Sequence, residues 1–350
     1  MLLEPRQHTP LWMTITAPII AVVIVLILSG GLISWAGAPL LDSYIALIVG
    51  AFGSKFAIAE TLVRATPLIL TGLAAAVAFR AKLWNIGGEG QLYAGALAVT
   101  YFGTGMIELP SFLMVPFLFF VGAIAGGLLL LFPALLKTKL KVDEVVTTLL
   151  LNFVVLLFAN YLLFGPWKDP MAMGWPQGAP VIEAGILENL VAKTRLHAGL
   201  IFSVLAAVCM WLVMSKTKWG LEIRAVGHNP DAAKFAGIPI NKTIIRTALI
   251  SGGLAACAGV TEVAGTKEYL TLDISPGFGY TGIAVAMLAG LNPLGVILAA
   301  LFLAGIYNGA DSMSRAMNVS NYIADVITAG SLLMVMLAVM LTRMRIRFKG

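Results

Sequence analysis

The residues with the greatest chemical potential lie in one polar segment, Trp84–Tyr93, which reads WNIGGEGQLY between two apolar stretches. Its side chains Asn85, Glu89 and Gln91 can hydrogen-bond or carry charge, and at membrane depth they are tolerated only against protein or water. The glycines among them let the backbone bend and let other elements approach closely. A path for a polar solute requires such a broken segment, so we predict that these three residues line a translocation path.

The composition identifies an integral membrane protein. Of 350 residues, 59% are hydrophobic and 11% are charged, with a mean hydropathy of +0.94, whereas soluble domains carry about 25% charged residues. The net charge of +6 comes from basic residues in short loops, a distribution that sets membrane orientation and does not indicate nucleic-acid binding. Cys209 and Cys257 both lie in apolar runs, so we expect neither a disulfide nor a metal site.

Apolar runs suited to helices of about 20 residues predict an all-α membrane protein, a polytopic bundle of about ten spans (eight to ten). The runs are Trp12–Ser34, Thr61–Phe79, Gly88–Ile107, Ser111–Leu136, Val145–Gly165, Ala198–Ser215, Thr243–Gly265, Gly277–Leu291, Leu294–Ala310 and Tyr322–Leu341. Two stretches leave the number open. Gly277–Pro293 is either a span or part of a re-entrant hairpin, and Leu40–Phe52 is short enough to be interfacial or re-entrant.

Basic residues favour one orientation of this bundle. They concentrate in alternate loops, above all between residues 137 and 141 and between 216 and 246, and such loops are cytoplasmic. We therefore predict that both termini are cytoplasmic, that residues 216–242 form a cytoplasmic coupling loop and that residues 166–197 form an extracytoplasmic loop. The aromatic residues of the outer loop favour a membrane interface, with docking of an external partner as the alternative. Residues 1–350 are predicted to form a single transmembrane domain.

A short helix within residues 216–242 has both of its ends encoded in the sequence. Asn229 suits the N-cap, Pro230 the first helical position and Asp231 the positive helix end. Gly237 suits a left-handed stop. Two turns of helix are too short to be stable alone in water, so flanking spans or a partner must hold it; a plain connector is the alternative. The predicted contact surface is small and has one large apolar side chain. It consists of Ala232, Ala233 and Phe235.

Four segments resemble signatures of the ABC-importer permeases of the nucleoside and simple-sugar branch, within the branched-chain amino acid and ribose-type permease superfamily. They are FRAKLWNIGGEGQ at 79–91, VDEVVTTLLLN at 142–152, AVGHNPDAA at 225–233 with Gly237–Ile238, and GIAVAMLAGLNP at 282–293. These segments run from the second predicted span to the ninth, so the resemblance covers most of the chain. Ala289–Leu291 stands where the family has Gly-Arg-Asn, which puts in doubt any role for a charge there.

The resemblance implies a type II ABC importer-like fold in the bacterial plasma membrane and uptake of nucleosides or related simple sugars. It also implies partners: cytoplasmic ATPase subunits, a second permease subunit that is identical or related, and an extracytoplasmic substrate-binding protein. The chain has no Gly-x-x-x-x-Gly-Lys-Ser/Thr motif, so we expect ATP and Mg²⁺ on the partner ATPase and no cofactor or catalytic site on this chain. The residues expected to couple to that ATPase are Asn229, Asp231, Ala232, Ala233, Phe235 and Gly237.

The polar residues within spans have structural interpretations beside the functional one. Asn152 is grouped here with the path residues, although such an amide more commonly forms hydrogen bonds between helices. Glu89 could instead be a helix N-terminal acid at the cytoplasmic interface. Asn85 and Gln91 could hold the broken backbone together without touching a solute.

Two other functions are considered. An ion-coupled secondary transporter of a small polar solute is the main alternative, and carboxylates deep within spans would favour it. The carboxylates in question fall near predicted span ends: Glu60, Glu262, Asp311 and Asp325. A membrane-embedded enzyme is disfavoured because the histidines lie in loops or tails without metal-ligand spacing; they are His8, His197 and His228.

Overall fold

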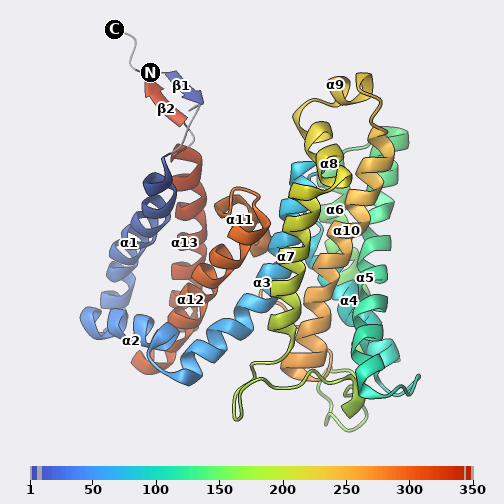
Figure 1. Ribbon diagram of the computed structural model, residues 1–350. Coiled ribbons are helices and arrows are strands. Elements are labelled where there is room, and N and C mark those ends of the chain that lie inside the picture. Colours follow the sequence, from blue (N-terminus) through green and yellow to red (C-terminus); the bar gives the residue numbers. More distant parts are fainter. Residues whose placement is uncertain (1, 6–9, 343, 348–350) are drawn as a thin grey trace. The chain divides into compact units, whose positions relative to one another are not determined.

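The structure is a computed structural model that describes residues 2–5, 10–342 and 344–347 (Figure 1). It confirms the all-α membrane class. Eight helices in the described part of the chain are long and apolar enough to cross a membrane, the lower end of the predicted range. The chain forms two compact units, one made from both chain ends and one from the middle.

The unit built from the chain ends comprises Met1–Thr61 and Leu301–Gly350. It holds α1 (Leu11–Trp35), α2 (Leu40–Phe52), the start of α3 (Lys55–Arg80), the end of α12 (Pro293–Met317) and α13 (Asn321–Thr342). Asn308 braces the corner between α2 and α3, because its amide nitrogen lies 3.1 Å from the Gly50 and Ala57 carbonyl oxygens and 3.0 Å from the Thr61 hydroxyl. A buried side-chain donor thus occupies the Gly50 carbonyl, which the end of α2 leaves without a helical partner.

Two short strands depart from the all-α prediction. β1 (Leu2–Pro5) pairs antiparallel with β2 (Met344–Arg347), with Leu2 opposite Arg347. The local sequence does not predict strands this short, because only their pairing across opposite ends of the sequence defines them. The pair brings both chain ends to one end of their unit, as an even number of spans requires; that this end is cytoplasmic stays a prediction.

The middle unit, Leu62–Ala300, contains the remaining helices. They are α4 (Gly88–Gly103), α5 (Ser111–Leu135), α6 (Glu144–Phe164), α7 (Gly199–Lys216), α8 (Lys218–His228), α9 (Pro230–Phe235), α10 (Ile240–Thr261) and α11 (Phe278–Leu288), with the adjoining parts of α3 and α12. α5 and α10 end in π-helical turns, η1 (Leu136–Leu140) and η3 (Glu262–Lys267), and η2 (Glu183–Gly185) is a short 3₁₀ turn.

Burial divides the helices of this unit into inner and outer members. Most of α3 and α10 is buried, whereas α5, α6 and α7 are about one-third buried or less and leave apolar faces outward, as lipid-facing helices do. Small residues let inner helices touch through their backbones. A Cβ atom at Gly252 of α10 would lie only 2.3 Å from the Gly126 carbonyl oxygen of α5, and one at Gly259 only 1.9 Å from the Leu92 carbonyl oxygen of α4.

Two predicted spans are shorter than hydropathy indicates. α4 has 16 residues and ends at Gly103 rather than Ile107. α11 has 11 residues, because left-handed backbone precedes it at Gly277 (φ +90°) and follows it at Gly290 and Leu291 (φ +60° and +61°). Gly277–Leu291 is therefore a short helix rather than a full span. α8, an amphipathic helix within residues 216–242, is not anticipated by the sequence analysis.

Candidate functional site

The polar break folds around a reciprocal pair of amides. Asn85 and Gln91 are buried, and each donates to the other, Asn85 Nδ2 to Gln91 Oε1 at 2.9 Å and Gln91 Nε2 to Asn85 Oδ1 at 2.8 Å. Asn85 Oδ1 also accepts the Gly87 N–H at 3.0 Å, and Asn85 Nδ2 donates to the Ser251 hydroxyl of α10 at 3.0 Å. Ser251 in turn donates to the Ala74 carbonyl of α3 at 2.7 Å. The break is thereby tied to α3 and α10.

Asn152 of α6 satisfies the backbone on the other side of the break. Its Oδ1 accepts the Gly90 N–H at 2.8 Å, and its Nδ2 donates to the Ile86 carbonyl at 2.9 Å and to the Tyr280 hydroxyl at 3.0 Å. The first turn of a helix has N–H groups without helical partners, and here a side chain from a neighbouring helix accepts one of them. Asn160, two turns further along α6, donates instead to its own helix at the Leu156 carbonyl.

Glu89 lies where the N-termini of two short helices meet. The residue is 4% exposed, and its carboxylate Oε2 accepts the Gly279 N–H of α11 at 2.7 Å. The two helices touch closely, since a Cβ atom at Gly279 would lie 2.1 Å from the Glu89 backbone nitrogen. A carboxylate at two positive helix ends is electrostatically favourable. Glu89 is therefore a helix N-terminal acid, but one enclosed by protein instead of standing at an interface.

The four sequence-predicted path residues thus come together at the start of α4, where they also meet Tyr280. Tyr280 is 39% exposed, and sequence analysis does not single it out. The available signal is its position in Gly277–Tyr280, where two glycines interrupt the approach to an apolar helix. Whether any of these residues contacts a solute stays a prediction.

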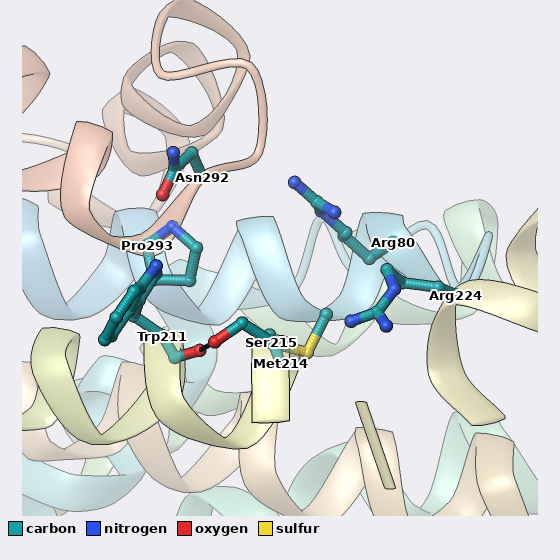
Figure 2. A pocket seen from close by; sticks show the side chains of 7 residues that line it. All are labelled: Arg80, Trp211, Met214, Ser215, Arg224, Asn292 and Pro293. Carbon is teal, nitrogen blue, oxygen red and sulfur yellow. Dashed lines mark hydrogen bonds between the residues drawn. The ribbon is translucent and has the colours of Figure 1, made fainter. Parts of the chain in front are cut away.

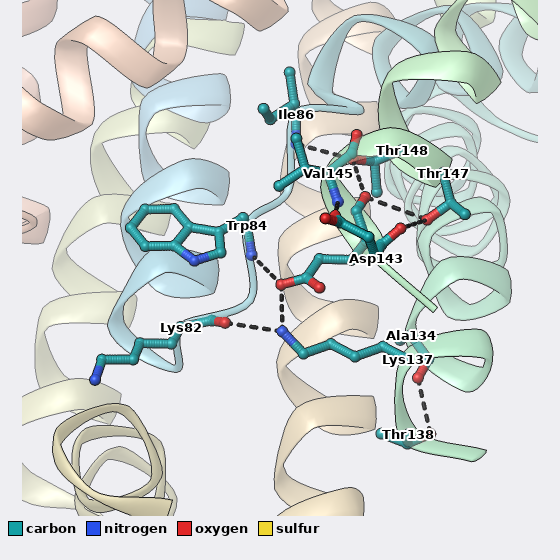
Figure 3. Close-up of polar contacts among 11 residues, drawn as sticks. Lys82, Trp84, Ile86, Ala134, Lys137, Thr138, Asp143, Val145, Thr147 and Thr148 are labelled. Carbon is teal, nitrogen blue, oxygen red and sulfur yellow. Dashed lines mark hydrogen bonds and ion pairs between the residues drawn. The ribbon is translucent and has the colours of Figure 1, made fainter. Parts of the chain in front are cut away.

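A second polar cluster fixes the segment just before the break (Figure 3). Glu144, buried at the start of α6, accepts the Trp84 N–H at 3.2 Å and forms an ion pair with Lys137. Lys137 also donates to the Lys82 carbonyl at 3.0 Å. The Asp143 side chain caps α6 by accepting the Val145 N–H at 2.7 Å. Lys137, which sequence analysis counts only as an orientation signal, therefore holds the turn after α5 to the break.

The predicted capped helix is confirmed as α9. Asn229 Oδ1 accepts the N–H groups of Asp231 and Ala232 at 3.0 and 3.1 Å, as an N-cap does. At the other end Gly237 has φ +78°, and the Gly237 and Ile238 N–H groups bond to the Lys234 and Ala233 carbonyls. This left-handed glycine ending is a common helix stop.

Ala233 and Phe235 of α9 face opposite ways, which corrects the predicted contact surface. Phe235 is 96% exposed, but Ala233 is 3% exposed. Ala233 lies in a buried cluster with Phe79, Leu83 and Ile244. It cannot meet a partner directly, because residues two positions apart on a helix point about 200° apart and its side is occupied by the protein's own core. Ala232 and Asp231 are exposed.

Helices of spanning length, a polar break buried among them and an exposed capped helix beyond their ends define a multi-pass membrane permease. The chain belongs to the family described as branched-chain amino acid transport system / permease component, whose model matches residues 57–341. It is therefore a transport subunit of an ABC system and not an enzyme. Such subunits work in general with ATPase and substrate-binding partners.

Three curated relatives match most of the chain. The guanosine ABC transporter permease protein NupP of Bacillus subtilis is 37% identical, covering 89% of this chain and 90% of its own. The glucose ABC transporter permease protein TsgB13 of Haloferax volcanii is 34% identical, covering 93% and 88%. The nucleoside ABC transporter permease protein NupB of Lactococcus lactis subsp. cremoris is 32% identical, covering 86% and 85%.

Proposed function

We propose that this permease takes up nucleosides, with simple sugars as the second substrate class, after delivery by an extracytoplasmic binding protein. Import is driven by ATP and Mg²⁺ bound to separate cytoplasmic ATPase subunits, and a second permease subunit completes the membrane part. The names of the relatives support both substrate classes, since two are guanosine or nucleoside permeases and one is a glucose permease. Membership in the ABC permease family disfavours the ion-coupled alternative.

The observation that carries the transport role is the buried polar network at the start of α4. Asn85, Gln91 and Asn152 use their amide groups within the chain, so their role is to hold the opening of α4 in shape. Tyr280 is the member that borders the path, while Glu89 is held at the adjoining N-termini of α4 and α11. Tyr280 offers a partly exposed aromatic face and hydroxyl, which suits an uncharged nucleoside base or sugar ring.

Packing within the middle unit supports a mechanical link from α9 to this network. Phe235 is the anchor that an apolar pocket of the ATPase would take. On the opposite side of α9, Ala233 belongs to the buried cluster that also contains Phe79 and Leu83, and Leu83 directly precedes the break at Trp84. A displacement of α9 is therefore transmitted through packed side chains to the segment that holds Asn85, because close-packed interiors transmit strain.

Transport by the assembled complex tests this proposal. Proteoliposomes that contain the permease subunits with their ATPase, supplied with binding protein, should take up labelled guanosine only when ATP is hydrolysed. Excess unlabelled nucleosides should compete, and glucose should not. Uptake of glucose without nucleoside uptake would assign the sugar class instead. Uptake that follows an ion gradient without ATP would overturn the importer mechanism.

A further inference from the structure

A cavity of about 370 Å³ is lined by residues from the ends of α3 and α7, from α8 and from the start of α12, and no residue of the polar network lines it (Figure 2). Arg80 reaches it from the last turn of α3 and Arg224 from α8. Trp211 and Ser215 come from the last turns of α7, and Asn292 from the turn before α12. It therefore joins elements that the proposed coupling movement would displace.

The charges in this cavity are uncompensated. Arg80 and Arg224 are half-buried, extend into the same space and repel one another electrostatically. The lining residues, all in the described part of the chain, include no carboxylate. Arg80 uses one of its five N–H donors in a hydrogen bond to the Leu291 carbonyl oxygen, which lies 3.1 Å from Nε. Arg224 makes no ion pair or hydrogen bond with the described residues.

Other cationic side chains in the same unit lie beside carboxylates. Lys137 pairs with Glu144. Arg246 lies 3.9 Å from a Glu222 carboxylate oxygen and 5.3 Å from the centre of the Trp219 ring. Two half-buried cations facing one cavity without a carboxylate are costly unless an anion joins them, so the cavity has the electrostatics of an anion site.

The remaining polar groups of the cavity are also donors. Asn292 Oδ1 accepts the Leu294 N–H at 3.1 Å, which leaves the Asn292 NH₂ group for a ligand. The Trp211 indole N–H has no partner among the described residues. Two guanidinium forks with amide and indole donors match the several acceptor oxygens of a phosphate group.

We propose that this cavity binds the phosphate of an anionic phospholipid headgroup. The second observation that favours a lipid over free phosphate is an exposed apolar stripe on α7. Ile201, Leu205, Val208 and Leu212 are 37–57% exposed and recur at helical spacing on one face, which continues to Ser215 at the cavity. Acyl chains lying along this stripe place the headgroup beside both arginines. Basic pockets between spanning helices on the cytoplasmic side bind anionic headgroups.

Thermal unfolding of the purified full-length permease in detergent tests this site. The additions are phosphatidylglycerol, phosphatidylcholine with the same acyl chains, and inorganic phosphate. Phosphatidylglycerol should raise the Tm by a few degrees more than phosphatidylcholine, and inorganic phosphate should leave it unchanged. Arg224→Gln should abolish the difference between the two lipids while leaving the Tm without lipid close to that of the wild type, because Arg224 makes no bonds within the described chain.

Lys216→Gln is the matched control, since it removes one positive charge from an exposed residue beside Ser215 that does not line the cavity. It should retain the lipid difference. Arg80→Gln provides an independent second variant with the same expected loss. Equal stabilisation of the wild type by both lipids, or a difference that persists in both arginine variants, overturns the proposal. If inorganic phosphate instead raises the Tm saturably, and Arg224→Gln removes that rise, the site binds soluble phosphate and the lipid proposal is wrong.

Discussion

The side-chain amides of Asn85 and Gln91 exchange two hydrogen bonds across the turn that opens α4. The pair closes a ring between residues six positions apart and is almost completely buried. It therefore behaves as one unit, since removing either amide leaves the other with unsatisfied buried groups. The geometry of the break depends on the pair rather than on either residue.

This pairing predicts non-additive effects of substitution. Asn85→Ala and Gln91→Ala should each lower the free energy of unfolding by about 1–3 kcal/mol, and the double variant should lose less than the sum, with a coupling of at least about 0.5 kcal/mol. Denaturant unfolding in mixed micelles measures all four forms. Asn160→Ala is the control and should have a small effect, because the Asn160 amide donates to the Leu156 carbonyl of its own helix. Strictly additive losses would show that the two amides act separately.

The contact between α4 and α11 predicts that Gly279 tolerates no side chain. Gly279→Ala would place a Cβ atom 2.1 Å from the Glu89 backbone nitrogen, and backbone can move only with its helix, so overpacking should cost about 1–3 kcal/mol. The Tm and the yield of folded protein should both fall. Gly31→Ala, at a helical glycine with open space around it, should be neutral. A Gly279→Ala protein as stable as wild type would contradict the close approach.

Features set by local physics were predictable from the sequence, and features set by long-range pairing were not. The caps of α9 follow from Asn229 and Gly237 because those residues act on their own turn. By contrast, Glu89 meets Gly279 across 190 positions. Hydropathy located every spanning helix but overestimated the length of α11, since left-handed backbone follows it at Gly290 and Leu291 and hydropathy does not register φ. The burial of Ala233 depends on neighbours that a two-turn pattern cannot reveal.

The proposed orientation predicts opposite labelling of two loops. In a Cys209→Ser background, which removes the exposed native thiol, a cysteine replacing Met173 should react with an impermeant thiol reagent in intact cells. Met173 is fully exposed in the segment predicted to be extracytoplasmic. A cysteine replacing the exposed Lys218 should react only after the membrane is permeabilised. Reaction at position 218 in intact cells would reverse the predicted orientation.

His197, outside the spanning helices, predicts loss of stability in acid. It is 1% exposed, accepts the Gly199 N–H at Nδ1 and contacts the Thr266 hydroxyl through Nε2, and burial lowers its pKa to about 4. The unfolded chain, with a His pKa near 6.5, therefore binds more protons between these values. The free energy of unfolding therefore has its full value above about pH 6.5. It decreases by up to roughly 3 kcal/mol as the pH drops toward 4.

The Tm measured from pH 7 to 4.5 should therefore fall less steeply in His197→Gln than in the wild type. The exposed His228 provides the control, and His228→Gln should follow the wild-type curve. Parallel curves for wild type and His197→Gln would show that other groups cause the acid sensitivity.

The two faces of α9 predict different defects from neighbouring substitutions. Phe235→Ala removes a ring that is 96% exposed, so the permease should fold normally. ATPase co-purification and uptake should fall at least tenfold, the effect of losing an interface anchor worth about 1.4 kcal/mol or more. Ala233→Glu forces a carboxylate into the cluster of Phe79, Leu83 and Ile244 and should lower the Tm itself. Lys234→Ala is the control, because Lys234 is exposed and adjacent to Phe235. It should retain most ATPase binding, which would separate loss of the ring from a general change in the helix. Normal ATPase association of the Phe235→Ala protein would make α9 a connector, and another surface would have to carry the coupling.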